Sequence, residues 1–248
     1  MPKILVADDN PVTLRFFAEA MAQLGFACEL ARDGADAVAR AERERFDLLL
    51  LDARMPELDG AQALARIRSH AGPSQRAPAV ATTAGTDDAG RRNLISAGFA
   101  DVIAKPVSVD ALHVALARHL RHSDDDTGTN APVVGDAALD DTSALAAVGG
   151  DRSILAALRG LLVAELNTLP AEFAAIATRA DVDALRDRLH RLDASAGFCG
   201  TPALARAGAR LRVALDAADA WPDAAATDFL AACADIRAQL LVSEPSTD

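Results

Sequence analysis

The sequence has no tyrosine and one tryptophan, and only 4% of its 248 residues are aromatic. Any hydrophobic core is therefore built mainly from alanine, leucine, valine and isoleucine. Three scattered cysteines, Cys28, Cys199 and Cys233, lack metal-site spacing and give no disulfide framework. No apolar run approaches the roughly 20 residues of a membrane span, and no signal peptide precedes the first strand. We therefore expect a cytoplasmic protein that does not enter a membrane.

Positive charge is scarce in the second half of the chain. Residues 1–122 carry 15 Lys and Arg against 16 Asp and Glu, whereas residues 123–248 carry 10 against 20. Nucleic-acid binding needs basic surface to neutralise phosphates. The acidic second half therefore argues against a nucleic-acid partner and against a DNA-binding output domain.

Short apolar segments alternate strictly with helical patterns through the first half. Strict alternation of strand and helix predicts a doubly wound α/β fold with five parallel strands. The run ending at Asp52 is apolar at nearly every position, as expected of a strand buried on both faces. Strands are predicted at 3–7, 26–31, the run ending at Asp52, 78–83 and 101–104, and helices at 12–24, 35–44, 60–69, 86–97 and 108–121.

Polar residues stand where these strands end. Asp8 and Asp9 follow the first strand, Asp52 ends the third, Thr83 the fourth, and Lys105 follows the fifth. Open parallel sheets place their chemistry at the carboxyl ends of the strands, which share one edge. Three carboxylates together repel one another and call for a cation, and all-oxygen ligands suit Mg²⁺. A hydroxyl and an ammonium beside that cation could hold an incoming phosphoryl group.

Residues 2–121 resemble the receiver domain of two-component response regulators, which has a flavodoxin-like fold. The resemblance implies that Asp52 is the phosphoacceptor. It also implies that Asp8 and Asp9 bind Mg²⁺ together with Asp52 and the backbone carbonyl of Arg54.

The same resemblance assigns roles to the ends of the last two strands. Thr83 would be the switch hydroxyl, followed by the small Ala84, and Lys105 would pair with the phosphate before a cis Pro106. One position departs from the family pattern: receivers usually carry Tyr or Phe where this sequence has Val102. The coupling of phosphorylation to the outer surface is therefore expected to differ, whereas the phosphorylation chemistry is not.

Residues 122–136 combine an acidic run with Thr, Gly, Asn and Pro and show no periodicity, which predicts a flexible linker. The division expected is residues 1–121, the linker 122–136 and a helical domain at 137–248. Apolar stripes with a period of 3.6 predict an all-α bundle of four main helices in the last part. Helices are predicted at 141–148, 151–167, 169–180, 183–198, 202–219 and 223–242.

The segment 189–200 carries the second candidate site. Leu185, Leu189, Leu192 and Ala196 share the core-facing side of a helix. A separate stripe that includes His190 lies roughly 100° around its axis. His190 is therefore expected to be solvent-accessible, and an exposed imidazole can act as a nucleophile towards phosphorus.

This segment resembles the histidine phosphotransfer (HPt) motif, and the resemblance extends over about residues 137–243. It implies that His190 is a second phosphoacceptor. The residues that match the motif are His190, Leu192, Ser195, Gly197 and Gly200.

Two positions depart from the HPt motif. Ala194 in place of Gly is a small change, but Asp193 stands where a Lys usually neutralises the phosphate one turn from the His. A carboxylate there should repel a phosphoryl group. Arg186, or Arg212 on the next helix, could compensate.

We interpret the chain as a phosphorelay protein with two phosphoacceptors and no kinase nucleotide motif, hence not itself an enzyme. Expected partners are a sensor histidine kinase, a receiver or an HPt protein. One alternative is a receiver-controlled binding module, in which the bundle docks a receiver or kinase without efficient transfer because of Asp193. Another is an inert dimerisation arm. No motif indicates the pathway or the oligomeric state.

Overall fold

The computed structural model describes residues 1–85, 88–120, 139–217 and 221–243. The chain divides into two compact units. The first is Met1–Pro132 with Ala147–Gly149, and the second is Val133–Ala146 with Gly150–Asp248. The linker expected at 122–136 lies outside the described residues.

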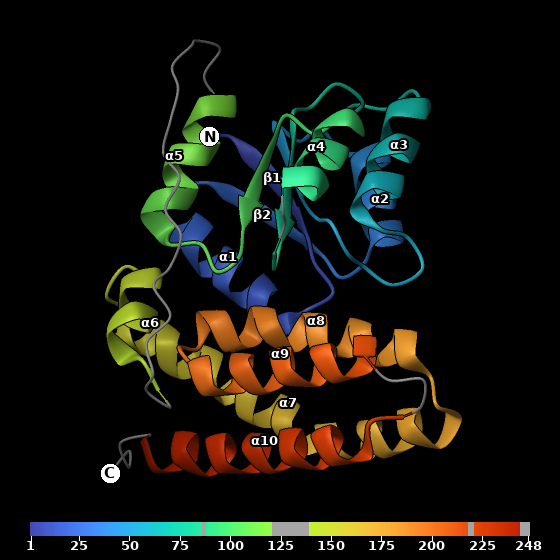
Figure 1. Cartoon of the computed structure of the whole chain (residues 1–248). Helices are drawn as coiled ribbons and strands as arrows, with labels where there is room; N and C mark the ends of the chain where they lie inside the picture. The colour runs from blue at the N-terminus through green and yellow to red at the C-terminus, as the bar shows by residue number, and fades with distance from the viewer. Residues whose placement is uncertain (86–87, 121–138, 218–220, 244–248) are drawn as a thin grey trace. The chain divides into compact units, whose positions relative to one another are not determined.

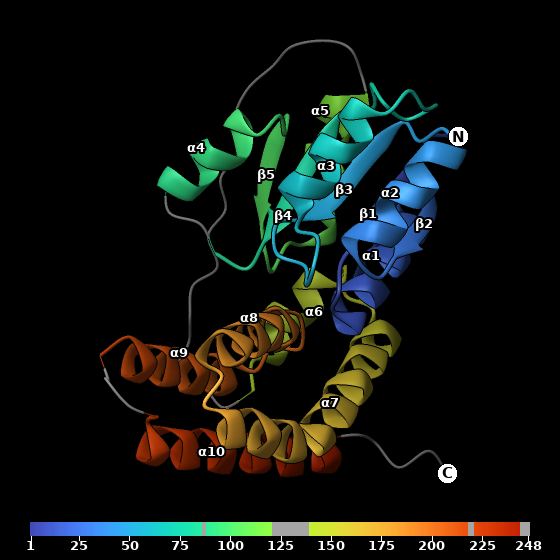
Figure 2. The same cartoon turned by 90° about the vertical axis from the view of Figure 1, so that its right-hand side faces the viewer.

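A parallel sheet of five strands, in the order β2-β1-β3-β4-β5, forms the centre of the first unit. Helices cover both of its faces, with α1 and α5 on one side and α2, α3 and α4 on the other (Figures 1 and 2). The doubly wound prediction is confirmed. The strands are β1 (Lys3–Ala7), β2 (Ala27–Ala31), β3 (Leu48–Asp52), β4 (Ala79–Thr83) and β5 (Asp101–Ala104). The helices are α1 (Pro11–Gln23), α2 (Gly34–Arg43), α3 (Gly60–Ser69), α4 (Asp88–Ser96) and α5 (Val109–Leu120).

Local sequence signals fix where the helices beside the strand ends begin. Asn10 caps α1 by accepting hydrogen bonds from the backbone of Val12 and Thr13, at 2.8 and 3.1 Å. Asp59 and Gln62 form a reciprocal capping box at the start of α3. These caps determine where the chain turns from strand to helix, directly beside the carboxylates that follow β1 and end β3.

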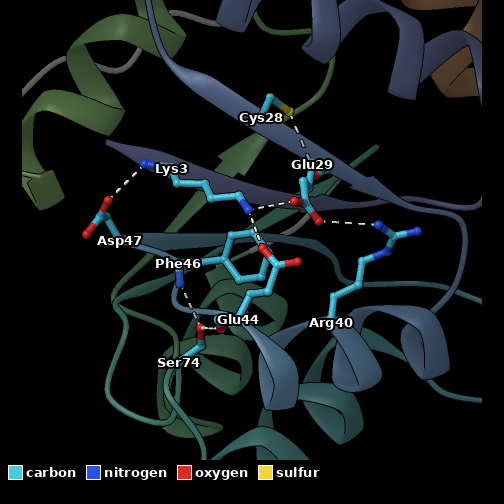
Figure 3. Close-up of polar contacts among 8 residues, drawn as sticks. All are labelled: Lys3, Cys28, Glu29, Arg40, Glu44, Phe46, Asp47 and Ser74. Atoms are coloured by element: carbon cyan, nitrogen blue, oxygen red, sulfur yellow. Dashed lines mark hydrogen bonds and ion pairs between the residues drawn. The ribbon is translucent and has the colours of Figure 1, made fainter. Parts of the chain in front are cut away.

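Ion pairs tie the amino ends of the strands together, at the opposite end of the sheet from those carboxylates. Figure 3 shows Lys3 at the start of β1 reaching Glu29 of β2 and Glu44 after α2. Arg40 of α2 approaches the same Glu29 at 3.3 Å. Because these side chains are partly exposed, solvent screens the pairs and their net contribution to stability is small.

A buried serine, Ser74, bonds the backbone at the same end of the sheet. The Ser74 hydroxyl accepts a hydrogen bond from the backbone N–H of Phe46 at 2.8 Å and donates one to the carbonyl of Glu44 at 2.6 Å (Figure 3). Ser74 is fully buried, so water cannot replace either bond. The hydroxyl therefore satisfies two backbone groups just before β3 begins.

Replacing Ser74 with alanine is expected to lower the free energy of unfolding by about 1–3 kcal/mol, because a buried N–H and a buried C=O lose their partner. Chemical denaturation of the full chain measures the loss. Ser69→Ala is the matched control, since Ser69 is exposed and its contacts, with the Arg66 carbonyl and the His70 ring, are exposed as well. Equal stability of the two variants would contradict the prediction.

The second unit is helical in all its described elements. Four helices pack in a closed sequence of neighbours, α7 on α8, α8 on α9, α9 on α10 and α10 on α7 (Figure 1). The helices are α6 (Asp141–Ala147), α7 (Arg152–Arg179), α8 (Val182–Phe198), α9 (Pro202–Ala217) and α10 (Asp223–Ser243).

One helix prediction is wrong: the two helices expected at 151–167 and 169–180 form a single helix, α7. Pro170 lies inside it. Proline removes one backbone hydrogen bond and disfavours a helix interior. The apolar stripe nevertheless runs through the proline without a break, so burial of one continuous face outweighs the lost bond. The buried stripe is Leu155, Leu158, Leu162, Leu166, Leu169, Phe173 and Ile176.

Among the described residues, α7 alone is long and apolar enough to cross a membrane by length and composition. A single helix of this length was not predicted from the sequence. Arg159 and Glu165 of α7 are bonded to Cys199 and Arg188, two residues of the second unit. Core helices of globular proteins pass the same test, and we interpret α7 as the core helix of its unit.

Candidate functional site

Three carboxylates meet at the carboxyl edge of the sheet. β1 and β3 pair in parallel with Ala7 opposite Leu51, so Asp8 and Asp9 after β1 come beside Asp52 at the end of β3. One carboxylate oxygen of each residue lies within 4.8 Å of one from each of the other two. Asp8 and Asp52 are buried, and Asp9 is half-buried. The topology therefore produces the cluster that the sequence analysis expected.

A buried lysine neutralises part of this charge. The Lys105 ammonium lies 2.7 Å from Asp8 Oδ2 and 3.1 Å from Asp52 Oδ2. Its backbone N–H donates to the carbonyl of Thr83 at 2.7 Å, which anchors the residue beside β4. The peptide between Lys105 and Pro106 is cis, as expected.

Thr83 is the last residue of β4 and is buried. Its neighbour Thr82 pairs with Asp52, so Thr83 lies one position beyond the acidic strand end. The Thr83 hydroxyl donates to the Gly85 carbonyl at 3.3 Å. The half-buried Ala84 follows it.

Burial makes the ionised form of these carboxyls unfavourable. It raises the pKa of Asp52 to about 7, although Lys105 acts to lower it, and repulsion from Asp8 adds to the rise. Burial likewise raises the pKa of Asp8. For Lys105, burial lowers the pKa, but attraction to the two carboxylates outweighs burial and the pKa ends raised. A cation beside the carboxylates would favour their ionised forms.

The donor set fits a hard divalent cation. Three carboxylates within 4.8 Å of one another supply oxygen ligands only, which suits Mg²⁺. Arg54 lies two residues beyond Asp52 in the turn before α3. The role of its carbonyl as a further ligand stays a prediction.

Val102 of β5, at the position where receivers usually carry Tyr or Phe, is buried, and so is Phe99 just before the strand. The Arg91 guanidinium of α4 donates to the Val102 carbonyl and to the Asp101 carboxylate, each at 2.8 Å. The sequence analysis missed Arg91, because one arginine on a polar helix carries no signal of its partner.

His190 lies on α8, but the expectation that it is solvent-accessible is only partly correct. Its side chain is half-buried, and the Nε2 atom is shielded from solvent. The residues that follow it on the helix are buried on more than the apolar stripe, since Ala194 and Ser195 are buried as well as Leu192. Side chains on this part of α8 are therefore enclosed more completely than periodicity predicts.

Asp193, the unexpected carboxylate one turn from His190, is paired with Arg212 of α9. Gly208 lies opposite the same carboxylate: a Cβ there would stand 3.3 Å from Asp193 Oδ1. Burial raises the pKa of Asp193, and Arg212 acts to lower it. Of the two arginines expected to compensate for Asp193, Arg212 therefore contacts it directly.

The other candidate, Arg186, is bonded elsewhere. Its guanidinium lies 2.8 Å from Asp216 of α9 and 3.3 Å from Asp183 of its own helix. The side chain is 43% exposed.

A partly buried network, which was not predicted from the sequence, joins α8 to α7. Arg188 donates to Glu165 at 2.7 Å and to Glu172 at 2.8 Å, and the Ser195 hydroxyl donates to Glu165 at 2.7 Å. The partners lie 16 to 30 residues apart in the chain. The sequence signal for such a network is that Arg188 and Glu165 stand among the apolar residues of the buried helix faces.

Comparisons with known proteins match different lengths of this chain. A family model described as "Response regulator receiver domain" matches residues 4–117. The sensor protein GacS of Pseudomonas syringae pv. syringae is 30% identical over 222 residues, covering 86% of this chain and 24% of that protein. The histidine-protein kinase BarA of Escherichia coli K12 is 29% identical over 206 residues, covering 80% of this chain and 22% of its own. The chain thus spans about a quarter of the length of these relatives.

A solved structure also matches the first half. It is the receiver domain of the sensor histidine kinase PA1611 from Pseudomonas aeruginosa PAO1, with a magnesium ion coordinated in its active-site cleft. The identity is 37% and the TM-score is 0.45. The match covers 48% of this chain and 97% of that one.

Proposed function

Residues 4–117 form a response regulator receiver domain, and from this premise we propose that Asp52 accepts a phosphoryl group from a partner's phosphohistidine. The observation that carries the proposal is the buried edge where Asp8, Asp9 and Asp52 meet the ammonium of Lys105. In this step the N–P bond of the donor breaks and an O–P bond forms at Asp52.

The residues at the carboxyl edge of the sheet have separate roles in that step. Lys105, already within 3.1 Å of Asp52, moves its charge to the incoming phosphoryl oxygens, and Thr83 supplies a hydroxyl from the next strand. Asp8, Asp9, Asp52 and the Arg54 carbonyl would hold Mg²⁺. When bound, the ion neutralises the charge of the phosphoryl group and favours the ionised carboxylates.

The second part of the proposal is that the helical unit is an HPt domain in which His190 exchanges a phosphoryl group with a receiver aspartate. The alignment with the GacS sensor protein supports it, because 222 aligned residues extend well beyond the 114 residues of the receiver match. The four packed helices α7–α10, with His190 on α8, supply the expected scaffold. The domains would then be residues 1–121 and 137–248, joined by 122–136.

The wider role follows from the two acceptors. We propose a cytoplasmic phosphorelay intermediate that works with a sensor histidine kinase, a receiver or an HPt protein. It would receive phosphoryl groups rather than hydrolyse ATP. Similarity to sensor kinases that span about four times its length supports these partners.

A second candidate function is a phosphorylation-controlled binding module. The paired carboxylate of Asp193 beside a half-buried His190 favours it, since both features oppose phosphotransfer. The bundle would then dock a receiver or kinase without accepting phosphate efficiently. Fast transfer to His190 in the wild type excludes this function, and a gain of transfer in Asp193→Lys supports it.

Phosphorylation assays test the leading proposal with two donors: a phosphorylated sensor kinase or HPt protein for Asp52, and a phosphorylated receiver for His190. We expect the wild type to carry two labels, an alkali-labile acyl phosphate and an acid-labile phosphohistidine. Asp52→Asn should retain only the second label and His190→Ala only the first. His113→Ala is the control, because this exposed histidine of α5 has no assigned role. Absence of label from both residues with every cognate donor would refute the relay.

A further inference from the structure

Two ion pairs between α8 and α9 bracket His190. The helices α8 and α9 are joined by the three residues 199–201 and pack against each other. Arg186, one turn before His190, pairs with Asp216, and Asp193, one turn after it, pairs with Arg212. Residues three or four positions apart lie side by side on a helix, so one member of each pair, Arg186 or Asp193, is a neighbour of His190 on α8.

The pair of Asp193 and Arg212 is the better protected of the two. The Asp193 side chain is 21% exposed and that of Arg212 is 34%, whereas Asp216 of the other pair is 68% exposed. Gly208, one turn from Arg212 on α9, lets the carboxylate lie close to that helix. Solvent therefore screens the pair of Asp193 and Arg212 less than the pair of Arg186 and Asp216.

A phosphoryl group on His190 would change the charge balance of this pair. It brings about two negative charges within one helical turn of a carboxylate, and no lysine is present at that position to offset them. Arginine is suited to the task, because its planar guanidinium binds phosphate with two parallel hydrogen bonds. Arg212 of α9 already pairs with Asp193, a residue one turn from His190 on α8.

We propose that Arg212 is the phosphate-binding cation of the His190 site, and that its guanidinium is paired with Asp193 only until a phosphoryl group arrives and replaces that carboxylate as its partner. This inference rests on the proposed role of His190 as an acceptor. In the transfer, the O–P bond of an aspartyl phosphate breaks and an N–P bond forms at one ring nitrogen of His190. The donor aspartate leaves as a carboxylate, and the other ring nitrogen keeps its proton. The guanidinium then turns from Asp193 to the phosphoryl oxygens.

The role can be separated from a structural one by comparing the two members of the pair. If the pair only holds α8 to α9, Arg212→Gln and Asp193→Asn impair phosphorylation equally. If Arg212 binds the phosphoryl group, Arg212→Gln impairs it, whereas Asp193→Asn leaves it unchanged or faster. The effects of the two substitutions therefore differ in direction.

The experiment uses the full chain with Asp52→Asn, so that the receiver aspartate is not labelled, and phosphoramidate as the phosphoryl donor. The rate of phosphohistidine formation at His190 is followed by phosphorus NMR and mass spectrometry. We expect Arg212→Gln to slow it by about 10- to 100-fold, the equivalent of one charge-assisted hydrogen bond. Arg212→Lys should recover part of the rate. Arg210→Gln, an exposed position on α9, should leave the rate within about twofold of its parent.

The outcomes distinguish the inference from the function on which it rests. Labelling of Arg212→Gln at the parental rate overturns the inference and leaves the acceptor role of His190 intact. Equal losses in Arg212→Gln and Asp193→Asn also overturn it, in favour of a structural pair. Absence of label at His190 in the parent refutes the acceptor role, and the inference with it. Circular dichroism of each variant confirms that the helices are retained.

Discussion

The Asp52→Asn variant is expected to be more stable than the wild type in metal-free solution at pH 8, by on the order of 4 kcal/mol. Asp52 is buried with Asp8 and beside Asp9, and a single ammonium offsets the three carboxylates. Asparagine has nearly the same shape and removes one of these charges. The residue that carries the proposed chemistry is therefore expected to cost stability.

The sign of the pH dependence follows from the raised pKa. Burial raises the pKa of Asp52 to about 7 in the folded protein, against 3.8 for the ordinary side chain. Between these values the unfolded chain releases a proton that the folded chain keeps. The stability due to this group is thus fully present below about pH 4 and is lost as pH rises through about 7. Asp52→Asn should lack this component.

Denaturation with urea at pH 5 and pH 8, in the presence of EDTA, measures both effects. Addition of Mg²⁺ should stabilise the wild type and have much less effect on Asp52→Asn, because binding to the folded state alone shifts the equilibrium. Glu57→Gln is the control, since it removes an exposed carboxylate from the turn after β3. A variant less stable than the wild type at pH 8 without metal would contradict the account.

Replacement of Arg188 with alanine is expected to destabilise the second unit by about 3–5 kcal/mol. Its side chain is 6% exposed and bonds Glu165 and Glu172. Without Arg188, the carboxylate of Glu165, which is only 14% exposed, keeps the hydrogen bond from the Ser195 hydroxyl but loses its ion pair. Removal of one partner of a buried ion pair costs far more than the pair itself contributes, because the remaining charge is uncompensated.

Arg186→Ala is the matched control for this prediction. Arg186 lies two residues away on the same helix and also pairs with two carboxylates, but its side chain is 43% exposed. Water and salt replace such pairs readily, so a much smaller loss is expected. Urea denaturation followed by circular dichroism should show the loss in the transition of the second unit. Equal losses of stability for both variants would show that burial does not determine how much these ion pairs contribute to the stability of the unit.

Much of the first unit could be predicted because its signals are local. A strand buried between two helical layers needs a continuous apolar run, which is why Leu48–Leu51 identified β3. Parallel pairing then brings the carboxyl ends of the strands to one edge, so Asp8, Asp52 and Lys105 converge whatever the details of packing.

Predictions failed where packing competes with a local rule. Pro170 disfavours a helix interior, yet α7 continues because its buried stripe does. His190 was expected to be exposed from periodicity alone, which assumes one apolar face per helix. It is half-buried because the following turns of α8 are buried more widely.

The sequence by itself determined the order of the elements, the acidic edge with Lys105 and the helix that carries His190. Each of these depends on spacing within a few residues or on the direction of parallel strands. The tertiary structure alone decided which arginine meets which carboxylate. Arg188 with Glu165 and Arg212 with Asp193 come from different helices, and ion-pair energies change with burial and with ångström shifts in distance. Those pairings determine the charge beside His190, and so how that residue could accept phosphate.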